Sequence, residues 1–231
     1  MKPGSCLAPA LLLLLVLNFS PAHAAWSEPA TIISGSWGTG AGQFGLRSEG
    51  GFSVVPFIES ITPEKQVIIS DLVNRKQMVF NSKGVLVNEL KWNRAKGREG
   101  KAIAPLPQKD RKAVQVYSMK SGAATYSITI VFPDKNLVVD SEEDLRSAVR
   151  DDAGFVYGIG TDLVIRFDKY GKKTSMLSLP KAHEELVAGP DQRTQRGVYI
   201  EYGVPVISPN GDVYVWQKSD AKFSILKWTW Q

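Results

Sequence analysis

The chain has 231 residues, with 28 Lys and Arg against 23 Asp and Glu and a formal net charge of +5. Hydrophobic residues make up 43% of it, as in an ordinary globular protein. The single cysteine, Cys6, lies near the start of the chain, where it is lost if a leader is removed. We therefore expect a mature chain without disulfides, thiolate nucleophiles or thiolate metal ligands.

Residues 1–24 are predicted to be a signal peptide. Lys2 provides the positive start, residues 10–17 form a short apolar core, and Ala22-His23-Ala24 matches a small-x-small cleavage site. We expect cleavage near Ala24 and an exported protein, periplasmic or extracellular, with one domain over residues 25–231. An uncleaved anchor is the alternative, although the apolar run is short for a bilayer. No later run is long enough to cross a membrane, so an integral membrane protein is not expected.

Short segments with a period of two dominate the rest of the chain and predict an all-β fold. They are rich in β-branched and aromatic residues, which strands favour. In chain order these predicted strands cover residues 30–37, 67–70, 78–80, 114–117, 126–132, 155–157, 163–167, 213–216 and 223–228. Turn signals containing Pro, Asp, Asn or Gly separate them. Helix signals are scarce, and only Asp140 to Val149 and Pro180 to Val187 are expected to hold a turn or two of helix.

Several segments repeat. Residues 62–69, 151–158 and 208–215 each combine a reverse turn with an apolar alternating strand. Residues 77–84 and 164–171 each combine a strand with a turn that ends in glycine. Repeats of about 40 residues built from four strands are typical of propeller blades. The isolated N-terminal strand, residues 30–37, is expected to pair beside the last strand and seal the ring.

The segment from Trp37 to Gly84 resembles the NHL-repeat family of β-propellers. The matching residues are Gly38-Thr39-Gly40-Ala41-Gly42-Gln43-Phe44, Ile68-Ile69-Ser70-Asp71, Asn74-Arg75 and Val79-Phe80 with Gly84. The resemblance implies a ring of four-stranded antiparallel blades, six in the family's usual form. The mature chain has room for only about four to five blades, so we expect a small or irregular propeller, with an unrelated β-sandwich as the alternative. The family's usual proline-led entry to the first strand is absent between Gly45 and Phe57.

Candidate chemistry is sparse, and we predict no catalytic residue, metal ligand or cofactor. His183 is the only histidine after the signal, which is too few for a typical zinc site, and a surface helix or loop is expected for it. Asp140 to Asp144 is interpreted as a solvated acidic loop or helix start, and Asp151-Asp152 as part of a turn. Asp71 and Asn74 are expected to hold a turn through local backbone hydrogen bonds, with Arg75 facing a neighbouring blade or a ligand.

A basic stretch is the one marked charge feature. It contains Lys91, Arg94, Lys96, Arg98, Lys101, Lys109, Arg111 and Lys112. A solvated loop is the simpler interpretation, and attachment to acidic glycans is the alternative. The stretch lacks the interleaved aromatic residues that stack on bases, so nucleic acid is not expected as a partner.

The sequence therefore predicts an exported, non-catalytic β-propeller that serves as a platform for an unknown protein, glycan or small ligand. The alternative is a divalent-metal, calcium-dependent hydrolase or lyase of the propeller type, because calcium needs only oxygen ligands. Neither the binding residues nor the oligomeric state follows from the sequence.

Overall fold

The computed structural model describes residues 25–50, 52–92, 111–121, 125–188 and 195–231. Every regular element in those ranges is a β-strand, which confirms the all-β class. The strands are β1 (Ala30–Ser36), β2 (Arg47–Glu49), β3 (Phe52–Val54), β4 (Phe57–Ile61), β5 (Val67–Asp71), β6 (Lys76–Phe80), β7 (Leu86–Lys91), β8 (Gln115–Ser121), β9 (Thr125–Val131), β10 (Asn136–Ser141), β11 (Ser147–Arg150), β12 (Val156–Ile159), β13 (Leu163–Phe167), β14 (Lys173–Ser178), β15 (His183–Ala188), β16 (Gln195–Tyr202), β17 (Val206–Ile207), β18 (Val213–Lys218) and β19 (Lys222–Trp228).

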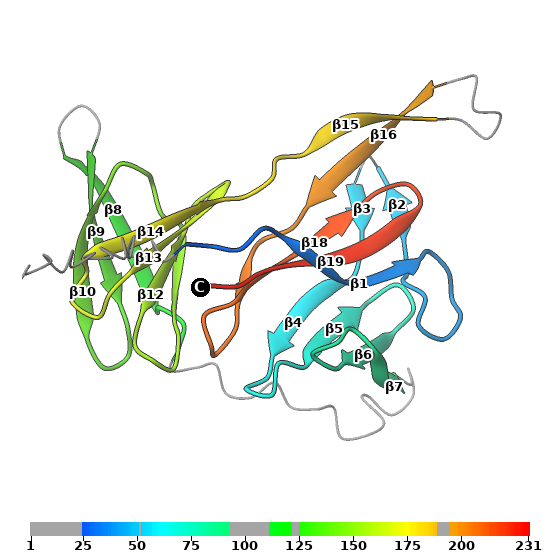
Figure 1. The fold of residues 1–231 in the computed structure, drawn as a ribbon, viewed down its shortest axis with the longest axis horizontal. Coiled ribbons are helices and arrows are strands. Elements are labelled where there is room, and N and C mark those ends of the chain that lie inside the picture. Colours follow the sequence, from blue (N-terminus) through cyan, green and yellow to red (C-terminus); the bar gives the residue numbers. More distant parts are fainter. Residues whose placement is uncertain (1–24, 51, 93–110, 122–124, 189–194) are drawn as a thin grey trace, which may run out of the picture.

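The strands form several small antiparallel sheets (Figure 1). Two sheets are four-stranded meanders in which neighbours in sequence are neighbours in space: β4-β5-β6-β7 and β11-β12-β13-β14. A three-stranded sheet has the order β10-β9-β8. A larger sheet, called here the terminal sheet, has the order β1-β19-β18-β16-β15, with β17 also paired to β18. The β2-β3 hairpin is separate.

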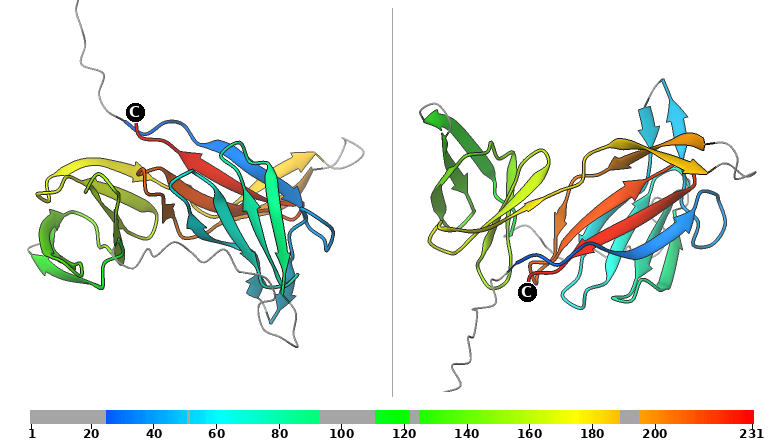
Figure 2. Two further views of the ribbon diagram at one scale, coloured as in Figure 1. Left: turned by 90° about the horizontal axis from the view of Figure 1, so that it is seen from below. Right: turned by 45° about the horizontal axis from the view of Figure 1, so that its top comes forward.

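Three hydrophobic clusters join the four larger sheets in a row. Met78 of the β4–β7 sheet packs with Ile225 of the terminal sheet in one cluster. Leu177 of β14 packs with Val213 of the terminal sheet in the second, and Ile128 of β9 packs with Ile165 of β13 in the third. Figure 2 shows the resulting two groups, β8 to β14 on one side and the remaining strands on the other. Among the described residues no such cluster joins the β4–β7 sheet to the β8–β10 sheet, and no closed ring is detected. The number of blades stays a prediction.

The N-terminal strand β1 forms one edge of the terminal sheet. Ile33 of β1 lies opposite Ile225 of β19, and Thr31 lies opposite Leu226, with a bulge between Thr31 and Ile33. The hydroxyl oxygens of Ser34 and Ser224 are 3.2 Å apart. The two strands run side by side in both views of Figure 2. The predicted pairing of the first strand with the last is therefore confirmed.

Five hairpin turns share one geometry, which explains the repeats seen in the sequence. In each, the first residue donates its N–H to the C=O of the fifth, and the fourth donates its N–H to the C=O of the first. The side-chain oxygen of the first residue also accepts the N–H of the fifth. These first residues are Thr62, Asn81, Asp151, Asp168 and Ser208. The pattern is a type I turn followed by a left-handed residue.

The left-handed position is where glycine is required in these turns. It is occupied by glycine in four of them, for example Gly84 with φ 75° and Gly154 with φ 88°. The first turn has Lys65 there, with φ 63°, a conformation that costs a residue with a Cβ about 1–2 kcal/mol. The turn from Thr62 to Gln66 nevertheless forms, because its backbone and Thr62 hydrogen bonds are the same as in the other four.

The Gly-rich segment after β1 is fastened to the β4–β7 sheet by hydrogen bonds. Asp71 Oδ2 accepts the N–H of Gly45 at 2.7 Å, and Asp71 Oδ1 accepts the N–H of Asn74 at 3.0 Å. Asn74 Nδ2 donates to the Gly38 carbonyl at 2.7 Å, and Lys76 Nζ donates to the Gly40 carbonyl at 3.0 Å. The expected turn-holding role of Asp71 is confirmed by its bond to the Asn74 N–H. The Asn74 side chain donates to Asp71 Oδ2 and to the Gly38 carbonyl instead of accepting a local backbone N–H. Both residues also anchor this preceding segment.

Both expected helical turns are wrong. In the first, Pro180 to Val187, the chain forms β15 from His183 onward. This strand pairs with β16 along its whole length, from His183 opposite Ile200 to Ala188 opposite Gln195. Residues 140–149 end β10, turn, and begin β11. There Ser147 to Arg150 pair with β12, and this pairing outweighs the weak helix propensity of the acidic stretch.

The packing of β1 against the β6–β7 turn can be tested at Gly84. A Cβ on Gly84 would overlap the carbonyl oxygen of Ile32 in β1, whereas a Cβ on Gly154 meets open space. Both glycines are left-handed, so Gly154→Ala should lower the free energy of unfolding by about 1–2 kcal/mol. Gly84→Ala should cost clearly more, by about 3 kcal/mol or above, because backbone must also move. Chemical denaturation of both variants measures the difference, and equal losses would contradict the packing.

Candidate functional site

A groove lies where β4 and β11, the first strands of their sheets, approach the segment that leads into β17 of the terminal sheet. It consists of two adjoining cavities of about 250 Å³ and 280 Å³, which share Ser147, Ile159, Val204 and Pro205. Its walls come from β4, from β11, and from the segment that leads into β17. Sites at the junction of structural units are common places for ligands. We call this feature the inter-sheet groove.

The inter-sheet groove is mainly apolar, with charges at separate positions. The apolar lining is supplied by Ile58, Val149, Ile159, Val204, Pro205 and Val206. The charged lining residues are Glu59 on the β4 wall, Lys112 beside β11 and Arg146 just before β11. An apolar pocket with a few polar groups is the usual composition of a small-molecule site.

Glu59 is held in place by two neighbouring strands. It sits at the register shift between Ile58 and Ser60 in β4, and bulges of this kind redirect side chains. Its Oε2 accepts a hydrogen bond from the Ser70 hydroxyl and another from Gln77 Nε2 at 2.7 Å. Within the part of the chain that the structure describes, no cation forms an ion pair with Glu59. Its carboxylate is therefore positioned by hydrogen bonds and has no cationic partner among the described residues.

Lys112 reaches the groove because the segment before β8 pairs with β11. Ala113 donates its N–H to the Ala148 carbonyl at 2.9 Å, and Arg150 donates its N–H to the Arg111 carbonyl at 2.7 Å. The Arg111 guanidinium donates to the Ser208 carbonyl at 2.7 Å and to the Arg150 carbonyl at 2.8 Å. Arg111 thus fastens β11 to the turn after β17. Lys112, the next residue, lines the groove.

The predicted basic stretch is only partly described. Lys91 is exposed at the end of β7, Arg111 is partly buried, and Lys112 is exposed at the groove. Arg94, Lys96, Arg98, Lys101 and Lys109 lie outside the described residues. The glycan-binding interpretation of this stretch stays a prediction.

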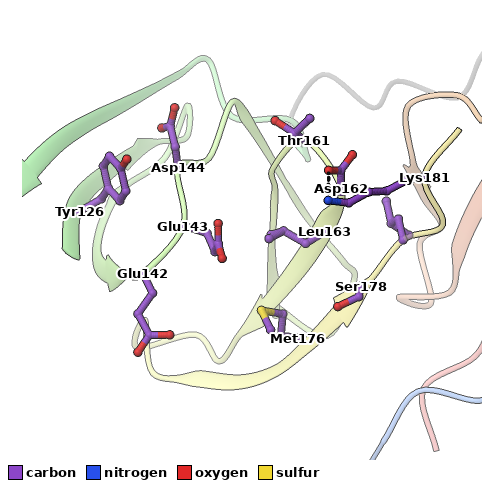
Figure 3. A pocket seen from close by; sticks show the side chains of 11 residues that line it. Tyr126, Glu142, Glu143, Asp144, Thr161, Asp162, Leu163, Met176, Ser178 and Lys181 are labelled. Atoms are coloured by element: carbon purple, nitrogen blue, oxygen red, sulfur yellow. Dashed lines mark ion pairs between the residues drawn. The ribbon is translucent and has the colours of Figure 1, made fainter. Parts of the chain in front are cut away.

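A cavity of about 370 Å³, separate from the inter-sheet groove, is lined by acidic residues (Figure 3). Glu142, Glu143 and Asp144 come from the loop between β10 and β11, and Asp162 from the turn between β12 and β13. Asp162 Oδ2 lies 3.2 Å from Lys181 Nζ, while Glu142 and Asp144 point away from each other in Figure 3. The exposed loop agrees with the solvated acidic stretch predicted there. Among the described residues, no group of three or more His, Cys, Asp or Glu side chains is arranged to hold a metal ion.

The remaining sequence candidates lie apart from the groove. His183 is exposed on β15 rather than on a helix or loop, with Nδ1 2.9 Å from the Lys181 carbonyl and Nε2 3.2 Å from Glu185 Oε1. The contact with the Lys181 carbonyl, followed by that with Glu185, raises the pKa of His183. Arg75 is exposed with φ 53°. Asp152 belongs to the turn that Asp151 begins, as predicted.

A buried polar network joins the β11–β14 sheet to the chain ends. The Tyr157 hydroxyl donates to Asp151 Oδ2 at 2.8 Å and accepts from Arg166 Nε at 3.2 Å. The Arg166 guanidinium lies over the rings of Phe155 and Trp230, at 3.5 and 4.5 Å from their centroids. The Tyr157 hydroxyl and both Asp151 carboxylate oxygens have hydrogen-bond partners, so we interpret the network as structural.

Sequence comparison adds no family to this picture. No protein-family model matches the chain, and no curated protein matches it. The resemblance to NHL repeats stays a prediction that depends on the residues quoted above. Within the described ranges, no helix is long and apolar enough to cross a membrane.

Two buried tyrosines predict a loss of stability at high pH. Burial, reinforced by the charge of Asp212, raises the pKa of Tyr214, and burial also raises that of Tyr157. A raised pKa in the folded state means that stability is complete below the unfolded-state value of about 10 and falls above it, by up to about 1.4 kcal/mol per pH unit per tyrosine.

The effect should be visible in urea denaturation between pH 9 and roughly pH 11.5. Tyr214→Phe should flatten the decline, because it removes one of the two groups. Tyr170→Phe is the matched control, since Tyr170 is 78% exposed. A wild-type protein whose stability does not change over this range would show that neither tyrosine is protected in the folded state.

Proposed function

We propose that the chain is an exported, non-catalytic binding protein of propeller-like, NHL-repeat-like architecture, and that its ligand occupies the inter-sheet groove. The four larger sheets would act as blades, with β4, β11 and β17 as the strands nearest the axis. The observation that carries the proposal is the groove itself, where these three strands meet around an apolar cavity with few charges. Loops and strand ends on a rigid scaffold are where binding residues concentrate.

The chemistry of the groove supports binding rather than reaction. Its charged residues are Glu59, Lys112 and Arg146, and the one carboxylate is already engaged by Ser70 and Gln77. A nucleophile activated by an adjacent base needs those two side chains in hydrogen-bond contact. The described lining residues include no such pair. Each of the two cavities, of about 250 Å³ and 280 Å³, lies on its own below the usual range for drug-sized ligands, so a ligand that fills one of them is small.

A groove-filling variant tests the proposal. Val204 lines both cavities and is 72% exposed, so Val204→Trp should fill the groove without disturbing the core. Val138→Trp is the control, because Val138 is 62% exposed on β10 and lines neither of the two groove cavities. The three proteins are compared by thermal shift against amino acids, sugars, nucleosides and carboxylic acids.

At least one class should raise the melting temperature of wild type and Val138→Trp, by roughly 5–11 °C when the ligand is at a hundred times its Kd. The same class should not stabilise Val204→Trp. A response that survives in Val204→Trp, or no response to any class in wild type, would contradict the proposed site.

A further inference from the structure

The inter-sheet groove separates its charges by sign. The carboxylate of Glu59 comes from β4, whereas the cations Lys112 and Arg146 flank β11 on the facing sheet. The surface between them is apolar, with Ile58, Val149 and Val206 among its residues. A ligand that complements this pattern carries a positive end, an apolar body and a negative end.

None of the three charged groups is paired with an opposite charge in the described part of the chain, although Glu59 accepts hydrogen bonds from Ser70 and Gln77. Among the described residues, neither Lys112 nor Arg146 forms an ion pair, and Glu59 forms none. Lys112 and Arg146 are exposed to solvent, whereas Glu59 is half-buried. The groove therefore offers two solvated cations and one hydrogen-bonded carboxylate as ion-pair partners for a ligand that enters it.

The support of Glu59 has a cost that structural stability does not explain. Gln77 is 1% exposed, and its amide NH₂ is turned toward the Glu59 carboxylate. In that orientation Gln77 Oε1 is buried without a hydrogen-bond partner among the described residues, and a buried acceptor left unpaired is destabilising. The Gln77 orientation that positions the Glu59 carboxylate at the groove wall therefore lowers the stability of the fold. Such a cost is typical of a functional position.

We propose that the groove binds a small zwitterion with an apolar body, the chemistry of an apolar α-amino acid or short apolar peptide. The ligand ammonium pairs with Glu59, and the ligand carboxylate pairs with Lys112, with Arg146 nearby. Apolar side chains of the ligand pack against Ile58, Val149 and Val206. This inference rests on the proposed function, since it assigns a ligand class to the same groove.

Isothermal titration calorimetry with four probes tests the charge requirement without altering the protein. The probes are L-leucine and L-leucyl-L-leucine, which are zwitterions, N-acetyl-L-leucine, which lacks the ammonium, and L-leucinamide, which lacks the carboxylate. At least one zwitterion should bind, and removing either charge should weaken binding about 10-fold or more.

Variants then assign each charge to a residue. Glu59→Gln should weaken the zwitterion about 10-fold or more but leave N-acetyl-L-leucine unchanged, because that probe has no ammonium to lose. Lys112→Gln should weaken the zwitterion but leave L-leucinamide unchanged. Glu142→Gln and Lys181→Gln, in the acidic cavity, are the matched controls and should change neither. Circular dichroism confirms the fold of each variant.

The outcomes separate this inference from the proposed function. If neither zwitterion binds at millimolar concentration, or if the uncharged-end analogues bind equally well, the zwitterion assignment is wrong. If a ligand of another class stabilises the wild type but not Val204→Trp, the groove remains the binding site for that different ligand. If Val204→Trp abolishes the binding of no ligand, both proposals are wrong.

Discussion

The pairing of β1 with β19 is the constraint on which the rest of the structure depends. It makes the first and last strands neighbours, with Ile33 opposite Ile225. Without β1, the whole length of β19 would be an open edge with unpaired backbone groups. Phe223 and Ile225 of β19, both fully buried, are at the centre of the cluster that receives the β4–β7 sheet. A strand from the N-terminal end therefore completes the sheet against which much of the molecule is packed.

The terminal sheet is also the hub of the row of sheets. One cluster joins it to the β4–β7 sheet and another joins it to the β11–β14 sheet. Because β17 belongs to this sheet, the segment from Val204 to Val206 is placed between β4 and β11. The groove is thus a consequence of how the sheets are joined. Its charges follow from local irregularities, namely the bulge at Glu59 and the pairing of residues 111–113 with β11.

The parts of the fold that sequence predicted are those set by local interactions. The turns at Thr62, Asp151 and Ser208 were identifiable because Pro, Asp, Asn or Gly marks each of them in the sequence. Asp71 and Asn74 were assigned to a turn for the same reason. Strands such as Leu163–Phe167 were evident from period-two hydrophobicity.

The parts that sequence did not predict depend on distant partners. β15 looked helical because Glu184, Glu185 and Leu186 are compatible with a helix, and only its pairing with β16 decides otherwise. The groove brings together Glu59, Lys112 and Val204, which no local pattern connects. No sequence motif marks Glu59 as a candidate site residue. Its bulge and its bonds to Ser70 and Gln77 emerge only when three strands are aligned.

A designed disulfide between β1 and β19 tests the central claim most directly. The hydroxyl oxygens of Ser34 and Ser224 are 3.2 Å apart on paired residues, so Ser34→Cys with Ser224→Cys should oxidise to an intrachain disulfide. Thiol alkylation and mass spectrometry are done with Cys6→Ser in the background, and Ser34→Cys with Ser175→Cys of β14 is the control pair. We predict a protected, monomeric disulfide for the first pair alone. Two freely alkylated thiols, or cross-links only between chains, would contradict the closure of the C-terminal sheet by the N-terminal strand.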